Sequence, residues 1–147
     1  MIVMKFGGTS TAGKEAISRL VDIAATRGEK KPVIVVSAMA GVTNALYAIA
    51  EAAESKNAAG THEMVEALRD QHIAVAEDLL GDYAGLLLPA TSKINEILDE
   101  LDEFTAAVCS IGELSERSKA AIVSKGELLS STIIGYALDA AGMKTAW

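Results

Sequence analysis

Apolar runs and helical periodicities alternate in the first part of the chain. Residues 2–6 are mostly apolar and end at a glycine pair, which is typical of a buried strand that enters a turn. Residues 32–38 form the strongest predicted strand, a continuous β-branched run of the kind that burial on both faces of a parallel sheet requires. Each strand is followed by apolar positions at helical spacing, Ile17, Leu20, Val21 and Ala24 after the first and Leu46, Ile49 and Ala53 after the second.

Two strand, loop and helix units in succession predict an α/β fold with a mainly parallel sheet and helices packed on its faces. Residues 61–108 change to a purely helical period that is interrupted at 81–89, which predicts an antiparallel helical hairpin inserted between sheet elements. One more helix is predicted at 124–142, and residues 143–147 then begin like a strand. We therefore expect a sheet that is incomplete at the C-terminus and a chain that is the N-terminal portion of a longer domain.

Composition restricts the classes of function. The 147 residues are 50% apolar with a net charge of −7, which fits one core and argues against nucleic-acid binding, because phosphate backbones are bound by clustered Lys and Arg. The longest apolar run, 33–42, is too short to cross a bilayer, so no membrane partner is expected. The single cysteine, Cys109, cannot form an internal disulfide. This favours a reducing compartment, for which we predict the cytoplasm.

The turn after the first strand contains a near match to a phosphate-binding P-loop. Residues 8–14 have the P-loop spacing of two glycines and a lysine, but the next residue is Glu15. A P-loop needs a Ser or Thr hydroxyl there to bind Mg²⁺, and a carboxylate adds repulsion beside a triphosphate. The sequence therefore disfavours a P-loop.

Two other interpretations of this turn stay open on the residues alone. The glycines can simply permit a tight turn, with a hydroxyl of residues 9–11 capping the next helix. Alternatively, the turn is a different phosphate cradle. Lys5 lies at the carboxyl end of a predicted strand, where ligands collect in α/β sheets, and Gly7 and Gly8 expose backbone N–H groups. An ammonium group, several N–H groups and nearby hydroxyls could together neutralise a transferring phosphoryl group.

Three sequence blocks carry a family resemblance. They are "KFGGTS" at 5–10, "VVSAMAGVTN" at 35–44 and "SKGELLSS" at 124–131. In this order they closely resemble the signatures of the aspartate kinases in the amino acid kinase family. The resemblance implies a three-layer αβα sandwich of the amino-acid-kinase or carbamate-kinase type. It also implies transfer of a phosphoryl group from ATP to L-aspartate, with Mg²⁺ bound through the nucleotide phosphates. A homo-oligomer is expected for a separate reason, because an unfinished parallel sheet exposes its edges. The nucleotide-binding half and the regulatory ACT domains of that family have no counterpart in residues 1–147.

The resemblance also implies roles for the residues of the first block. Lys5 is expected to touch the transferred phosphoryl group and to stabilise the transition state. Gly7, Gly8, Thr9 and Ser10 are expected to form the phosphate cradle. On this interpretation the P-loop spacing is a coincidence beside a different cradle.

The second and third blocks are expected to bind the amino acid. The resemblance assigns Ser37 and Thr43 to the substrate and Glu127 to its ammonium group. Each has an alternative, because Ser37 and Thr43 could cap a helix, and an acid such as Glu127 is favoured near any helix start. Two other functions also stay open: a kinase of the same fold for another small acid, and a non-catalytic module that binds an amino acid.

Several other patterns are interpreted as structural. The segment 62–66 begins like a zinc-protease helix but lacks the second histidine, so no metal site is expected. The acidic run 99–103 is expected on the solvent face of a helix, and 112–117 is expected to be a solvated turn without a ligand. Cys109 is expected to pack rather than to react.

Overall fold

Two parallel strands and six α-helices make up residues 1–146, the part of the chain that the computed structural model describes. The strands are β1 (Ile2–Phe6) and β2 (Pro32–Val36), paired in register so that Lys5 lies opposite Val35. The helices are α1 (Lys14–Ala25), α2 (Val42–Glu54), α3 (Ala58–Leu80), α4 (Ala84–Ile111), α5 (Glu116–Val123) and α6 (Lys125–Ala140). Short 3₁₀ turns, η1 (Gly8–Thr11) and η2 (Gly28–Lys30), precede α1 and β2. The predicted α/β class and parallel pairing are confirmed.

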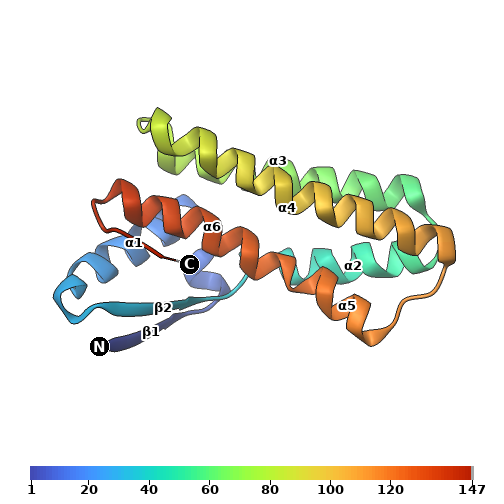
Figure 1. The fold of residues 1–147 in the computed structure, drawn as a ribbon, viewed down its shortest axis with the longest axis horizontal. Helices are drawn as coiled ribbons and strands as arrows, with labels where there is room; N and C mark the ends of the chain where they lie inside the picture. Colours follow the sequence, from blue (N-terminus) through green and yellow to red (C-terminus); the bar gives the residue numbers. More distant parts are fainter. Residues whose placement is uncertain (147) are drawn as a thin grey trace.

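The elements form layers over one face of the sheet. Helices α1 and α6 lie beside β1 and β2, and the long antiparallel pair α3 and α4 covers α6 from the other side (Figure 1). The predicted helical hairpin is thus confirmed, and it packs against α2 and α6. None of the helices in residues 1–146 combines the length and apolarity needed to span a bilayer.

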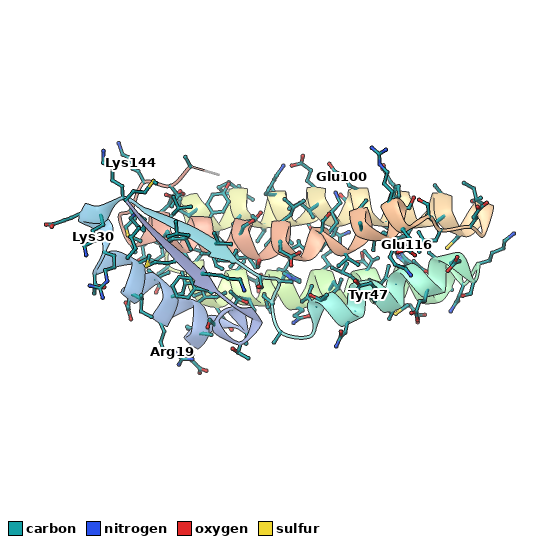
Figure 2. All side chains as sticks on the ribbon, turned by 90° about the horizontal axis from the view of Figure 1, so that it is seen from below. Arg19, Lys30, Tyr47, Glu100, Glu116 and Lys144 are labelled. Atoms are coloured by element: carbon teal, nitrogen blue, oxygen red, sulfur yellow. The ribbon has the colours of Figure 1, made fainter. Side chains whose placement is uncertain are left out.

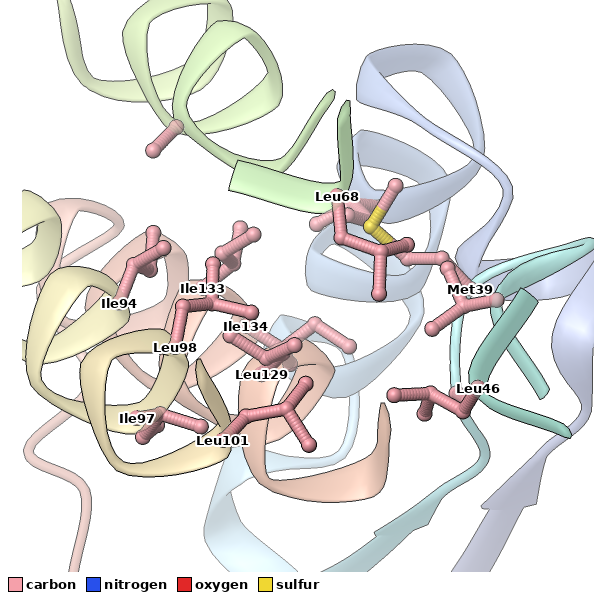
Figure 3. Close-up of a cluster of buried hydrophobic side chains, with 14 of the residues drawn as sticks. Met39, Leu46, Leu68, Ile94, Ile97, Leu98, Leu101, Leu129, Ile133 and Ile134 are labelled. Carbon is pink, nitrogen blue, oxygen red and sulfur yellow. The ribbon is translucent and has the colours of Figure 1, made fainter. Parts of the chain in front are cut away.

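One hydrophobic core joins the sheet side of the molecule to the hairpin. Side chains from α2, α3, α4 and α6 meet in it, including Leu46, Leu68, Leu98, Leu129 and Ile133 (Figure 3). All the apolar positions predicted for the first two helices are buried except Val21, which is half-buried. Burial of a Leu or Ile side chain stabilises the fold by about 1.5–3 kcal/mol, so this shared core fixes the hairpin to the sheet layer.

The sheet differs from the prediction in one respect. Burial on both faces was expected for residues 32–38, but Val33 and Val35 are 45% and 44% exposed. Val3 and Lys5 of β1 are exposed on the same face. The reason is that α1 and α6 cover only the face to which Met4, Phe6, Ile34 and Val36 contribute. In residues 1–146 the sheet therefore has one covered face and one open face.

The predicted strand at 143–147 is not formed over residues 143–146, and Trp147 lies outside the described residues. The helix predicted at 124–142 ends at Ala140, and Gly142 follows it with φ +80°, a conformation that glycine adopts readily after a helix end. The Thr145 N–H then donates to the Asp139 carboxylate at 3.0 Å, so this segment bonds back to α6 and not to a neighbouring strand.

Two further boundaries differ from the prediction. The interruption expected at 81–89 is confined to 81–83, because α4 begins at Ala84 and includes Pro89. Leu87 of its first turns packs against the core, which offsets the backbone hydrogen bond that Pro89 cannot donate. The turn expected at 112–117 is wrong in its second half, because Ser115 accepts a hydrogen bond from the Ser118 N–H and starts α5.

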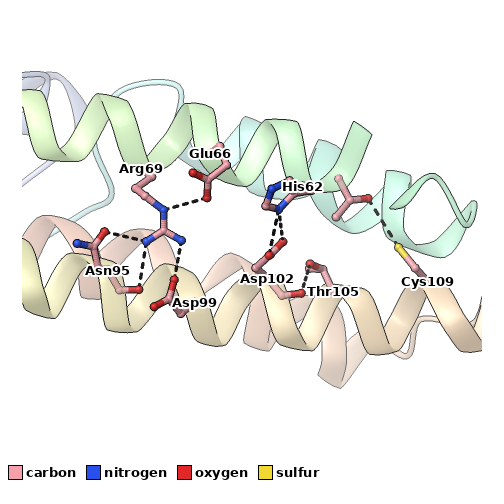
Figure 4. A network of polar contacts seen from close by, with 9 residues as sticks. His62, Glu66, Arg69, Asn95, Asp99, Asp102, Thr105 and Cys109 are labelled. Carbon is pink, nitrogen blue, oxygen red and sulfur yellow. Dashed lines mark hydrogen bonds and ion pairs between the residues drawn. The ribbon is translucent and has the colours of Figure 1, made fainter. Parts of the chain in front are cut away.

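Charged side chains connect the hairpin helices across their solvent faces. Arg69 of α3 donates to Glu66, Asn95 and Asp99, and His62 contacts Asp102 at 3.0 Å (Figure 4). The acidic residues of the run 99–103 are therefore on the solvent side of α4, as predicted: Asp99, Glu100 and Glu103 are exposed and Asp102 is half-buried. His62, the first residue of the zinc-protease-like segment, is used in this polar pairing.

Candidate phosphate and amino-acid site

The two predicted ligand loops leave the sheet at the same edge, because β1 and β2 are parallel. The first loop is η1 with the preceding Gly7, and the second is residues 37–41 between β2 and α2. A hydrogen bond of 3.1 Å from the Ser37 N–H to the Phe6 carbonyl extends the strand pairing into this region. Residues separated by about thirty positions in sequence thus become neighbours at the carboxyl end of the sheet.

The glycine turn is open in the way that an anion cradle requires. A β-carbon on Gly7 would meet nothing within 4 Å, and one on Gly8 would lie 3.4 Å from the Ala38 carbonyl oxygen. The N–H groups of Gly8 and Thr9 donate no hydrogen bond within residues 1–146. Thr9 is exposed and Ser10 is half-buried. Free N–H groups beside hydroxyls suit the oxygens of a phosphate.

The interpretation of residues 9–11 as helix caps is wrong. Helix α1 begins at Lys14 after Gly13, whose φ of +150° no other residue type adopts easily, and no side chain caps it. The hydroxyls of 9–11 lie in the separate turn η1 and precede that start. This leaves Thr9 and Ser10 available for a ligand.

Thr11 also lies in this region, although the sequence predicted no ligand contact and no loop contact for it. Its side chain is fully buried, and its Oγ1 lies 3.1 Å from both the Gly8 and the Ala38 carbonyl oxygens. It therefore connects the glycine turn to the second loop. A hydroxyl within a run of small polar residues gives no sequence signal that distinguishes this role from capping.

The third block reaches the same place from the start of α6. The Glu127 carboxylate Oε1 lies 3.5 Å from the Ala38 nitrogen, a long contact, and Glu127 is otherwise exposed. Ser130, fully buried, donates to the Ser37 carbonyl oxygen at 2.9 Å. A β-carbon on Gly126 would lie 2.8 Å from the Ala38 β-carbon, so only glycine lets α6 approach this closely. The structure thus brings the glycine turn, Ser37 and Glu127 together.

Lys5 and Thr43 occupy the borders of this region. Lys5 is exposed on the open face of the sheet, two residues before the glycine turn, and no hydrogen bond or ion pair within residues 1–146 engages its ammonium group. Thr43 is the second residue of α2 and is exposed. The interpretation of Thr43 as a cap is wrong, because α2 begins after Gly41, with φ +83°, and has no side-chain cap. Both side chains are accessible to a ligand.

No other part of residues 1–146 offers a stronger chemical site. This part of the chain has no group of three or more His, Cys, Asp or Glu side chains that could bind a metal ion. A groove of about 540 Å³ lies between β2, α6 and residues 143–146, and Lys31 and Lys144 line it. Lys144 lies at the same end of the molecule as Lys30 (Figure 2). The groove contains none of the predicted site residues.

Comparison with known proteins gives consistent matches. A sequence profile described as the amino acid kinase family matches residues 1–147. The chain is 34% identical to aspartokinase 1, chloroplastic, of Arabidopsis thaliana over 97% of its own length and 24% of that protein. It is 31% identical to lysine-sensitive aspartokinase 3 of Escherichia coli, over 100% of its own length and 30% of that protein. The chain thus spans about a quarter to a third of the length of these two relatives.

Solved structures agree. Escherichia coli aspartokinase III in complex with lysine and aspartate matches with a TM-score of 0.81 and 29% identity, over 98% of this chain and 30% of that one. The same enzyme in complex with aspartate and ADP matches with a TM-score of 0.78 and 29% identity, over 97% of this chain and 29% of that one.

Proposed function

This chain belongs to the amino acid kinase family, and we propose that it is the N-terminal part of an aspartate kinase. The complete enzyme would transfer the γ-phosphoryl group of ATP to the side-chain carboxylate of L-aspartate, giving 4-phospho-L-aspartate, the first step of lysine, threonine and methionine synthesis. One observation carries the proposal: three separate sequence blocks meet at one edge of the sheet, in a chain similar to a kinase solved with aspartate and ADP.

In this proposal the glycine turn binds the phosphates. The free N–H groups of Gly8 and Thr9 and the open space at Gly7 support this role, as does the Ser10 hydroxyl. Lys5 would supply a positive charge to the phosphoryl oxygens. Because phosphoryl transfer depends mainly on positioning and charge neutralisation, these groups need no covalent step. Mg²⁺, when bound through the nucleotide phosphates, would neutralise part of their charge.

The amino acid would bind between the second loop and α6. Ser37 and Thr43 can donate hydroxyl hydrogen bonds to a carboxylate, and Glu127 can accept hydrogen bonds from an ammonium group. The proximity of Glu127 to the second loop supports this pairing. The negative charge of Glu127 would favour a substrate that carries an ammonium group, and would thus select an amino acid over a plain dicarboxylate. Cytoplasmic location and homo-oligomerisation stay predictions.

The proposal is tested with the complete protein that contains this chain, by measuring ADP formation from ATP with L-aspartate or L-glutamate. We expect turnover with aspartate. Equal or better use of glutamate would favour a kinase for another acid. Aspartate binding without turnover would favour a binding module. Residues 1–147 alone are expected to lack kinase activity.

A pair of matched variants tests the role assigned to Glu127. Glu127→Gln should lower kcat/KM for aspartate by about 10- to 100-fold, because hydrogen bonds to charged groups contribute about 1.5–3 kcal/mol. Glu113→Gln is the control, since the same Gly-Glu-Leu sequence occurs at 112–114, where Glu113 is exposed. Similar losses in both variants would contradict the assignment.

A further inference from the structure

A buried hydroxyl lies between the two loops of the proposed site. Thr11 Oγ1 is within 3.5 Å of four carbonyl oxygens, those of Gly7, Gly8, Ser37 and Ala38. The first two belong to the glycine turn and the other two to the loop after β2. Thr11 is fully buried, so water does not compete for its hydroxyl hydrogen.

The geometry lets this single hydroxyl hold both loops. A hydroxyl donates one hydrogen at a time, and the two acceptors at 3.1 Å come one from each loop. Loss of the hydroxyl would leave an apolar side chain facing the Ala38 carbonyl oxygen in a buried contact and the Gly8 carbonyl oxygen in a part-buried one, which is costly because a buried acceptor loses its partner.

A second buried hydroxyl holds the same peptide from the opposite element. Ser130 of α6 donates to the Ser37 carbonyl oxygen at 2.9 Å, and this oxygen also lies 3.5 Å from the Thr11 hydroxyl. The Ser37–Ala38 peptide is therefore held between η1 and α6. Gly126 packs against Ala38 directly beside this contact.

We infer that Thr11 and Ser130 are positioning residues that fix the distance between the phosphate-binding turn and the amino-acid-binding loop. This inference rests on the proposed function, in which each loop binds one of the two substrates. Phosphoryl transfer needs the attacking and leaving oxygens in line at short separation, and a displacement of about 1 Å can cost about 10²-fold in rate. Neither residue needs to touch a substrate, because each acts through the Ser37–Ala38 peptide.

The test compares three variants of the complete protein, Thr11→Val, Thr11→Ser and Ser130→Ala, with the control Thr132→Val. Thr132 suits the comparison because it is also buried, and its hydroxyl donates only to Leu128 of its own helix at 2.8 Å. Two quantities are measured: amide hydrogen exchange in segments 7–12 and 37–42, and the separate kcat and KM values for ATP and aspartate.

We expect Thr11→Val and Ser130→Ala to speed exchange at 37–42, and Thr11→Val also at 7–12, by roughly tenfold, the effect of losing one buried hydrogen bond. The kcat should fall by about tenfold with each KM changed by less than about twofold, because alignment and not binding is lost. Thr11→Ser should restore both quantities, and Thr132→Val should change neither.

The outcomes separate the inference from the proposed function. Unchanged exchange in Thr11→Val and Ser130→Ala overturns the inference, and so does faster exchange with an unchanged kcat. If the unsubstituted protein forms no ADP with aspartate while the variants exchange faster, the link between the loops is supported and the proposed kinase function is refuted.

Discussion

Acidification should destabilise this protein through one buried histidine. His72 lies fully buried on α3, its Nδ1–H donates to the Leu68 carbonyl oxygen at 2.7 Å, and its Nε2 has no hydrogen-bond partner in residues 1–146. Burial lowers the pKa of His72 below its usual 6.5, although the Leu68 contact partly opposes this. A charged ring there would place a second N–H donor in an apolar core.

The sign and size of the effect follow from proton linkage. Below pH 6.5 the unfolded chain protonates this histidine while the native chain keeps it neutral, so stability falls as pH falls until the native pKa is reached. The slope is about 1.4 kcal/mol per pH unit for one proton. A change from pH 7.5 to pH 5.5 should therefore cost up to roughly 1.4 kcal/mol from this residue, the full value applying if the native ring stays neutral throughout, against the roughly 5–15 kcal/mol typical of a domain.

Urea denaturation at pH 7.5, 6.5 and 5.5 measures this cost, with variants that separate the two histidines. His72→Leu should lose the additional pH dependence, because leucine has a similar volume and no proton to gain. His62→Gln should keep it, since His62 is exposed and its contact is with Asp102 on the surface. If His72→Leu shows the same pH dependence as the unsubstituted protein, the reasoning is refuted.

Three further predictions concern packing and charge. Gly126→Ala should lower the free energy of unfolding by about 1–3 kcal/mol, because the added methyl group overpacks the contact with Ala38. Gly85→Ala should raise the free energy of unfolding by up to about 1 kcal/mol in the same urea assay, because an added β-carbon there meets nothing within 4 Å. Arg69→Met should lower the free energy of unfolding by about 1 kcal/mol, and by less at high salt, because this arginine joins two helices through partly exposed carboxylates. Lys93→Met removes an ion pair within one helix and should leave the free energy of unfolding unchanged. Cys109 is buried, so its reaction with a thiol reagent should be slow in the native protein and fast in urea; fast native reaction would contradict the packing described.

Most elements were predictable because their signals are local. Strand β1 has the predicted bounds, and β2 lies within the predicted 32–38. The hairpin helices extend only a few residues beyond 61–108. The errors had two sources. Packing of the first turns of α4 on the core decided that this helix includes Pro89. Local contacts were missed at Ser115, which accepts from the Ser118 N–H and starts α5, and at Thr145, which donates to Asp139 where a strand was expected.

The candidate site was likewise predictable in part, in its local sequence signals but not in its spatial arrangement. The three sequence blocks contain Gly7, Gly8, Ser37 and Glu127, because glycines and short polar side chains at strand ends and helix starts mark ligand loops without reference to the fold. Their proximity could not be deduced in this way, and neither could the burial of Thr11 and Ser130 between them.

The sequence by itself determined most of the residues that form strands and helices and which short segments carry candidate chemistry, since periodicity and turn residues act within a few positions. Only the tertiary structure decided that two loops and one helix start meet, and that one face of the sheet is open in residues 1–146. The physical reason is that hydrogen bonds such as that from Ser130 to Ser37 join residues far apart in the chain, and they form only after the helices have packed on the sheet.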